Sequence, residues 1–135
     1  MDNRKIGVFD SGVGGLTVFS EIKKELPNEN IIYVGDTKRF PYGSKSKENI
    51  IQISKQIVNY LILQDVKLIV IACGTATSQA LEELRKIYRI PILGIIEPTI
   101  ENCINKDTKS IGIIATKGTI RSGEWEKQIK QKMGW

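Results

Sequence analysis

The sequence predicts an α/β protein: a three-layer α/β/α sandwich with a mostly parallel, doubly wound sheet. Two observations lead to this fold class. Short segments that are apolar along their whole length alternate with longer segments whose apolar residues recur at helical spacing. Apolar strands joined by helices are typical of a parallel sheet covered on both faces, and right-handed crossovers place helices on both sides. The 135 residues fit one domain spanning residues 1–135.

Five apolar runs of strand length are the predicted strands, and polar or turn-forming residues bound them. Leu68–Ala72 has the clearest strand composition, because it is rich in β-branched side chains. The predicted strands are Lys5–Phe9, Ile31–Val34, Leu68–Ala72, Pro91–Ile95 and Ser110–Ala115.

Apolar residues spaced three and four apart predict helices between these runs. The first helix begins at about Leu16 and ends before Pro27, which lacks the backbone N–H that a helix interior needs. The other predicted helices are a long one marked by Ile50, Ile53, Ile57 and Tyr60, one over Ala76–Tyr88, a short one from about Pro98, and a last one striped by Trp125, Ile129 and Met133.

Composition and charge argue against several classes of function. The two cysteines lie far apart and there is no histidine, so we expect neither a metal site nor a disulfide. The lack of a disulfide framework favours a cytoplasmic protein. The N-terminus resembles neither a signal peptide nor a membrane span. The net charge is +5, and we expect its densest basic stretch, Lys117–Lys132, to be a solvated helix face rather than a nucleic-acid interface.

The ligand crevice of a doubly wound sheet lies outside the carboxyl ends of its strands. This rule selects four loops as the candidate site: Asp10–Gly15, Asp36–Ser46, Cys73–Thr75 and Thr116–Thr119. Two of them have a structural and a functional interpretation. Asp10–Gly15 is either a tight strand-to-helix turn or a small-anion site. Asp36–Ser46 is either a solvated loop or a carboxylate site on backbone amides near Tyr42.

Cys73 is the most chemically suggestive residue of these loops. It directly follows a buried strand and precedes a helix, where unpaired amides favour the thiolate and tend to lower a thiol's pKa. The alternative is an inert thiol, because free cysteine is among the most buried residue types. Cys103, within a short predicted helix, is expected to pack in the core.

Three motifs in order resemble the glutamate racemases of the aspartate/glutamate racemase family. They are Ile6–Val18 with its Asp-Ser-Gly-Val-Gly-Gly turn, Gly35-Asp36-Thr37 followed by Pro41-Tyr42-Gly43, and Ala72-Cys73-Gly74-Thr75-Ala76. The resemblance runs through essentially the whole chain and covers the N-terminal half of the family's usual length.

The resemblance implies an isomerase that interconverts L- and D-glutamate for peptidoglycan synthesis with no cofactor and no metal. In this family one cysteine removes the α-proton from one face, and a second delivers a proton to the other. The resemblance implies that Cys73 is one of these bases and that Asp10 assists its ionisation. The implied substrate-binding residues are Ser11, Tyr42, Gly43, Gly74 and Thr75.

The chain departs from the family pattern at two points. Position 74 is glycine where the family usually has asparagine, and the Gly-Cys-Thr-His motif of the family's second half has no counterpart here. We therefore expect this half to be inactive alone, with either the missing C-terminal half or a second copy as its partner. The alternative function is a non-catalytic binding module for small anions or amino acids.

Overall fold

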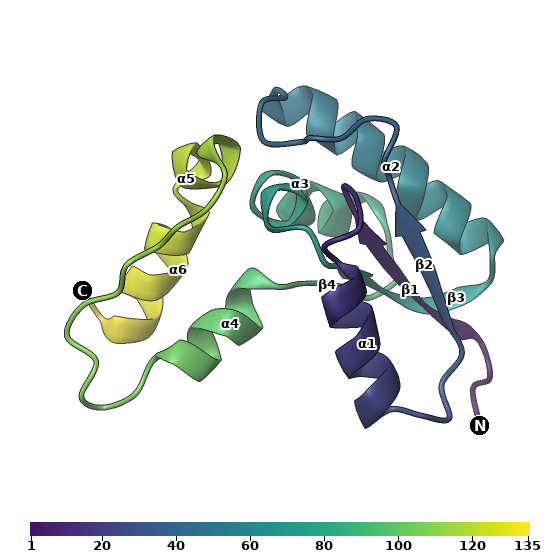
Figure 1. Cartoon of the computed structure of the whole chain (residues 1–135), viewed down its shortest axis with the longest axis horizontal. Coiled ribbons are helices and arrows are strands. Elements are labelled where there is room, and N and C mark those ends of the chain that lie inside the picture. Colours follow the sequence, from purple (N-terminus) through teal and green to yellow (C-terminus); the bar gives the residue numbers. More distant parts are fainter.

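The structure, a computed structural model, describes residues 1–135. At its centre lies a four-stranded parallel sheet with the strand order β2-β1-β3-β4 (Figure 1). The strands are β1 (Lys5–Asp10), β2 (Ile31–Gly35), β3 (Val66–Ile71) and β4 (Ile92–Gly94). The predicted α/β class with a parallel sheet is confirmed.

Helices lie on both faces of this sheet, α1 on one side and α2 and α3 on the other (Figure 1). Alternation along β1 explains the two layers, because Phe9 points into the cluster formed with α2 and α3, whereas Val8 points toward α1. The helices are α1 (Leu16–Glu25), α2 (Lys47–Leu63), α3 (Gly74–Ile87), α4 (Ile96–Cys103), α5 (Lys117–Ser122) and α6 (Glu124–Met133).

Local signals in the sequence account for several helix ends. The hydroxyl of Ser46 accepts a hydrogen bond from the backbone N–H of Asn49 at 3.1 Å and caps the start of α2. Gly134 adopts a left-handed conformation at the end of α6, which glycine does without steric cost. No helix combines the length and the apolar composition that crossing a membrane requires.

Helices α4, α5 and α6 lie to one side of the sheet, where the chain ends (Figure 1). Ile96 and Ile100 of α4 pack against Ile129 of α6 in an apolar cluster separate from the two sheet layers. The molecule therefore has a sheet-centred part and a smaller helical part, connected through β4 and α4.

The predicted fifth strand, Ser110–Ala115, is not formed. The residues between α4 and α5 belong to no helix or strand, and Ile111 and Ile113 pack against the α4–α6 cluster instead. The reason is topological: α4 begins directly after β4, carries the chain away from the sheet edge, and leaves this segment without a neighbouring strand. A β-branched sequence forms a strand only where a partner satisfies its backbone.

Candidate functional site

Three of the predicted loops meet at the carboxyl ends of β1, β2 and β3. The N–H of Asp36 donates to the carbonyl oxygen of Asp10 at 3.0 Å, and the N–H of Ala72 donates to that of Phe9 at 2.8 Å. These two bonds extend the strand pairing past the ends of β2 and β3. They place Asp10, Asp36 and Cys73 at one edge of the sheet, as the strand-end rule predicts.

Asp10 organises the turn between β1 and α1. Its carboxylate oxygen Oδ2 accepts hydrogen bonds from the backbone N–H groups of Gly12, at 3.1 Å, and Gly15, at 3.0 Å. A Cβ at position 15 would lie only 2.6 Å from the Cβ of Asp10, so only glycine allows this approach. The buried carboxylate thus holds the loop in the shape that presents Ser11 toward Cys73. This arrangement agrees with the structural interpretation of Asp10–Gly15 as a tight strand-to-helix turn.

Cys73 occupies the N-cap position of α3, where its sulfur accepts a hydrogen bond from the N–H of Ala76 at 3.4 Å. The side chain is almost fully buried, and this burial raises the pKa of the thiol above its ordinary value. Hydrogen bonds from Ala76 and Ser11 act in the opposite direction but are outweighed, and the negative charge of Asp10 adds to the increase.

The expected lowering of the Cys73 pKa is therefore wrong in direction. The helix N-terminus contributes as the sequence suggested, through the N–H of Ala76, but desolvation of the thiolate is the larger effect. The negative charge of Asp10 also raises the pKa of the Cys73 thiol, so it opposes formation of the thiolate.

A hydrogen bond between Tyr42 and Asp36 stabilises the loop between β2 and α2. The buried phenol of Tyr42 donates to the Asp36 carboxylate at 2.5 Å, and Arg39 forms an ion pair with the same oxygen at 2.6 Å. Burial raises the pKa of Tyr42, so its hydroxyl remains a donor. The hydroxyl of Tyr42 is therefore engaged within its own loop.

A cluster of threonine hydroxyls forms the opposite side of the site. The Oγ1 atom of Thr75 lies 2.7 Å from that of Thr116 and 3.2 Å from that of Thr119, while the last two are 2.9 Å apart. A Cβ at position 43 would lie 2.9 Å from the Cβ of Thr116, so the cluster reaches the Tyr42–Gly43 loop. All four selected loops therefore come together.

Thr116 and Thr119 are the residues that sequence reasoning missed, although it selected their loop. The signal was present as a threonine N-cap, since Thr116 precedes α5 and accepts from the N–H of Thr119. Sequence alone does not show that this cap contacts Thr75, because the contact depends on the path of the chain through α4 and the segment after it.

The space beside the Cα atom of Gly74 is unoccupied by other protein atoms. A Cβ built on Gly74 would have only the Cδ1 atom of Ile95 within reach, at 4.0 Å. The first residue of α3 therefore leaves room for a side chain or for a ligand beside Cys73 and Thr75.

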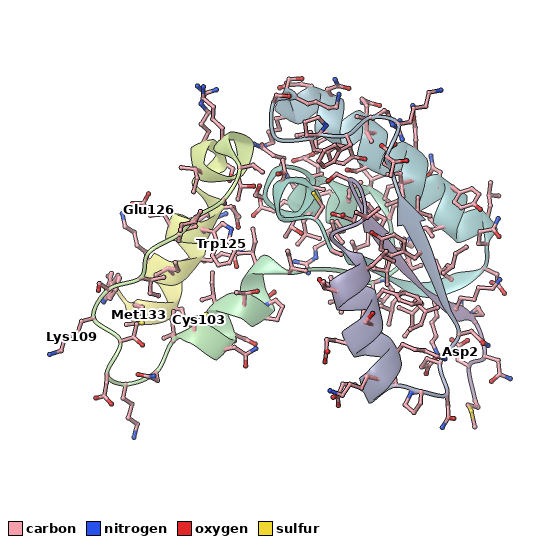
Figure 2. The ribbon with its side chains drawn as sticks, viewed as in Figure 1. Asp2, Cys103, Lys109, Trp125, Glu126 and Met133 are labelled. Carbon is pink, nitrogen blue, oxygen red and sulfur yellow. The ribbon has the colours of Figure 1, made fainter.

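Cys103, expected in the core, is exposed at the last residue of α4. Figure 2 shows it on the helical side of the molecule with Trp125 and Met133, away from the sheet. The core prediction failed because the apolar face of α4 is carried by Ile96 and Ile100. No group of histidine, cysteine or acidic side chains is placed to hold a metal ion.

The strand-end loops bring together a thiol, a buried carboxylate and threonine hydroxyls in an α/β protein with a parallel sheet. A thiol among polar groups can take part in proton transfer. Residues 6–134 match the family described as Asp/Glu/Hydantoin racemase, and the chain belongs to this family.

Curated relatives agree with this assignment. A glutamate racemase of Lactococcus lactis subsp. lactis is 52% identical over 133 residues, which are 98% of this chain and 49% of the relative. A glutamate racemase of Aquifex aeolicus is 46% identical over 128 residues, 94% of this chain and 50% of the relative. The chain thus spans about half the length of the curated relatives it matches.

Solved structures of glutamate racemases also match this chain over about half of their own length. The glutamate racemase isoform RacE1 from Bacillus anthracis matches with a TM-score of 0.93 and 42% identity, covering 100% of this chain and 51% of that one. The glutamate racemase from Francisella tularensis, solved in complex with D-glutamate, matches with a TM-score of 0.90 and 42% identity over 98% of this chain and 50% of its own. The fold of the described residues is that of half a glutamate racemase.

Proposed function

We propose that this chain forms one half of the active site of an isomerase that interconverts L- and D-glutamate without a cofactor. Cys73 is the acid/base group for one face of the α-carbon. The observation that carries the proposal is the position of this thiol, which caps α3 at the carboxyl end of β3 with Asp10 and Ser11 beside it. Membership of a racemase family and the D-glutamate complex of a relative support the substrate class.

Groups suited to the two carboxylates and the amino group of glutamate surround the thiol. The hydroxyls of Ser11, Thr75 and Thr116 donate or accept hydrogen bonds, and the backbone N–H groups near Gly43 and Gly74 donate to carboxylate oxygens. Tyr42 contributes by holding its loop against the Asp36 carboxylate. We assign Ser11, Gly43, Gly74 and Thr75 to substrate binding, with the role of Tyr42 carried by its backbone.

Inversion of the α-carbon consists of two proton transfers, one from the substrate and one back to it. The Cys73 thiolate takes the α-proton of glutamate and becomes a thiol, while the electron pair stays on the α-carbon as a carbanion. Return of the proton from Cys73 regenerates the starting enantiomer, and a proton delivered to the opposite face gives the mirror image. The raised pKa of Cys73 favours the protonated thiol, so abstraction is the harder step at neutral pH.

Inversion therefore needs a second acid/base group on the opposite face. Cys103, the other thiol of this chain, is the last residue of α4 and lies in the helical part, away from the sheet (Figure 2). We propose that a polypeptide corresponding to the other half of the relatives supplies this group. In the complete enzyme the product D-glutamate would serve peptidoglycan synthesis in the cytoplasm, and the isolated chain would exchange protons on one face only.

A non-catalytic module that binds small anions is the second candidate function. Gly74 favours it, because no side chain extends from this position to orient a substrate beside Cys73. The two functions differ in the exchange of the α-proton of glutamate with solvent. A binding module binds glutamate but does not remove this proton.

Deuterium exchange into glutamate tests the proposal. L-Glutamate and D-glutamate are incubated separately with the chain in D2O, and loss of the α-proton signal is followed by NMR. We expect slow exchange of one enantiomer with the wild-type chain and with Cys103→Ser, and none above background for either enantiomer with Cys73→Ser. Glutamate binding without any exchange would reject the proton-transfer role and leave the binding module.

A further inference from the structure

The phenol of Tyr33 reaches from β2 to the turn between β1 and α1, and the proposed function does not use it. Its hydroxyl donates a hydrogen bond to the carbonyl oxygen of Gly12 at 2.8 Å. The parallel register sets Tyr33 beside Val8, on the sheet face that α1 covers (Figure 1). The ring of Phe19 on α1 packs edge to face against the phenol, with the ring centroids 6.0 Å apart. Packing on this face therefore aims the hydroxyl at the turn.

Gly12 is fixed in the turn through both of its backbone groups. Its N–H donates to the Asp10 carboxylate at 3.1 Å, and its carbonyl oxygen accepts a hydrogen bond only from the phenol of Tyr33. Glycine at position 35 lets β2 come close to the turn, because a Cβ there would clash with that carbonyl oxygen. The close approach of β2 thus places the Gly12 carbonyl within reach of the phenol.

Ser11 lies next to Gly12 in the chain and contacts the thiol. Its hydroxyl and its backbone both form hydrogen bonds with the sulfur of Cys73. We propose that Tyr33 is a positioning residue, which holds Ser11 against Cys73 by anchoring the carbonyl of the next residue. The carboxylate of Asp10 fixes only N–H groups of the turn, so without the phenol the Gly12 carbonyl has no donor. The importance of this positioning for proton transfer rests on the proposed function, whereas the contact itself does not.

Three titratable groups lie near the Cys73 thiol, and they are Asp10, Tyr33 and Tyr42. Burial raises the pKa of Tyr33 to about 12 and that of Tyr42 well above its usual range, so both phenols are neutral at mildly alkaline pH. Removing the Tyr33 hydroxyl therefore removes a hydrogen bond and no charge. The hydrogen bonds from Ser11 lower the pKa of the Cys73 thiol, so their loss raises it.

Alkylation of Cys73 with iodoacetamide at a fixed, mildly alkaline pH tests the positioning role. All variants carry Cys103→Ser, so that only one thiol reacts, and the thiolate is its reactive form. Tyr33→Phe keeps the ring and should slow the reaction roughly two- to five-fold, because the pKa of the thiol rises when the Ser11 hydrogen bonds weaken. A turn that merely loosened would expose the thiol and speed the reaction instead.

A double-variant comparison shows whether the effect passes through Ser11. Ser11→Ala should slow alkylation by itself, and Tyr33→Phe should have a smaller effect in that background than in the parent chain. Tyr88→Phe is the matched control, because this phenol also donates a hydrogen bond, to Asn59 at 2.7 Å, but at the other end of α3. The control should react as the parent does. Circular dichroism checks that each variant is folded.

Two results would overturn the positioning role. One is an unchanged or faster reaction of Tyr33→Phe, and the other is equal slowing with and without the Ser11 hydroxyl. The reaction contains no glutamate, so its outcome is independent of the proposed function. If the wild-type chain exchanged the α-proton of neither glutamate enantiomer, the proton-transfer role would fail while the positioning of Cys73 by Tyr33 stood. If exchange occurred and Tyr33→Phe reacted as the parent does, only the positioning role would fail.

Discussion

The thiol of Cys73 is subject to opposing influences that sequence reasoning weighed incorrectly. Its place at the start of a helix is visible in the sequence, and the structure adds the hydrogen bond from Ala76 that this position provides. The degree of burial is not visible, because it results from how the strand-end loops close over the thiol. Burial raises the pKa of the Cys73 thiol more than the hydrogen bonds lower it.

Alkylation of Cys73 as a function of pH measures this balance. In a Cys103→Ser background Cys73 is the only thiol, and its thiolate is the reactive form. Because the pKa of the folded thiol is raised, the thiol form prevails at neutral pH and the thiolate appears only as pH rises through the elevated value. We expect the rate with iodoacetamide to keep increasing through the alkaline range. A plateau below pH about 8.5, the usual thiol value, would contradict the assignment.

Gly74 offers a second test on the scale of one residue. Gly74→Asn places an amide beside Cys73 in space that is open in the structure. A new hydrogen bond to a charged ligand is worth about 1–3 kcal/mol, so calorimetry should show glutamate binding roughly five- to 150-fold tighter. Gly74→Ala fills the space without an amide and is the control. Equal affinities for the two variants would show that position 74 does not face the ligand.

Among the elements, those with local signals were predictable and those defined by a distant partner were not. The four strands of the sheet and all helices except the short α5 were predicted. Their signals, which are apolar periodicity, the helix stop at Pro27 and strand composition, lie within the segments themselves. Ser110–Ala115 carries the same composition, but no neighbouring strand is present for it. The contact between Thr75 and Thr116 likewise depends on how α4 turns the chain.

The hydrogen bond from Tyr42 to Asp36 is expected to stabilise the loop between β2 and α2. Tyr42→Phe removes the donor to the buried Asp36 carboxylate and leaves Arg39 as its partner. A hydrogen bond to a charged group contributes on the order of 1–3 kcal/mol, so the free energy of unfolding in urea should fall by about this amount. Tyr60→Phe, an exposed position on α2, should change it by less than about 0.5 kcal/mol. Equal effects of both changes would mean that the phenol does not secure the loop.

For the whole molecule, the central feature is the set of loops that meet at one edge of the sheet. The sheet brings Asp10, Ser11 and Cys73 together, and the helical part adds the hydroxyls of Thr116 and Thr119. The proposal that a second half completes the site draws on the match to about half of each relative. The motifs in the sequence identified the strand-end loops, whereas the contact of the helical part with these loops required the structure.

The configuration of glutamate after incubation with the wild-type chain in D2O tests the account most directly. Chiral chromatography coupled to mass spectrometry separates the enantiomers and counts α-deuterium in each. Each enantiomer is supplied separately. The account predicts that the enantiomer whose α-proton faces Cys73 gains deuterium while the opposite enantiomer stays at background, because proton return occurs on one face. Robust formation of D-glutamate by monomeric chain, abolished by Cys73→Ser, would contradict it, since the chain would then hold both bases.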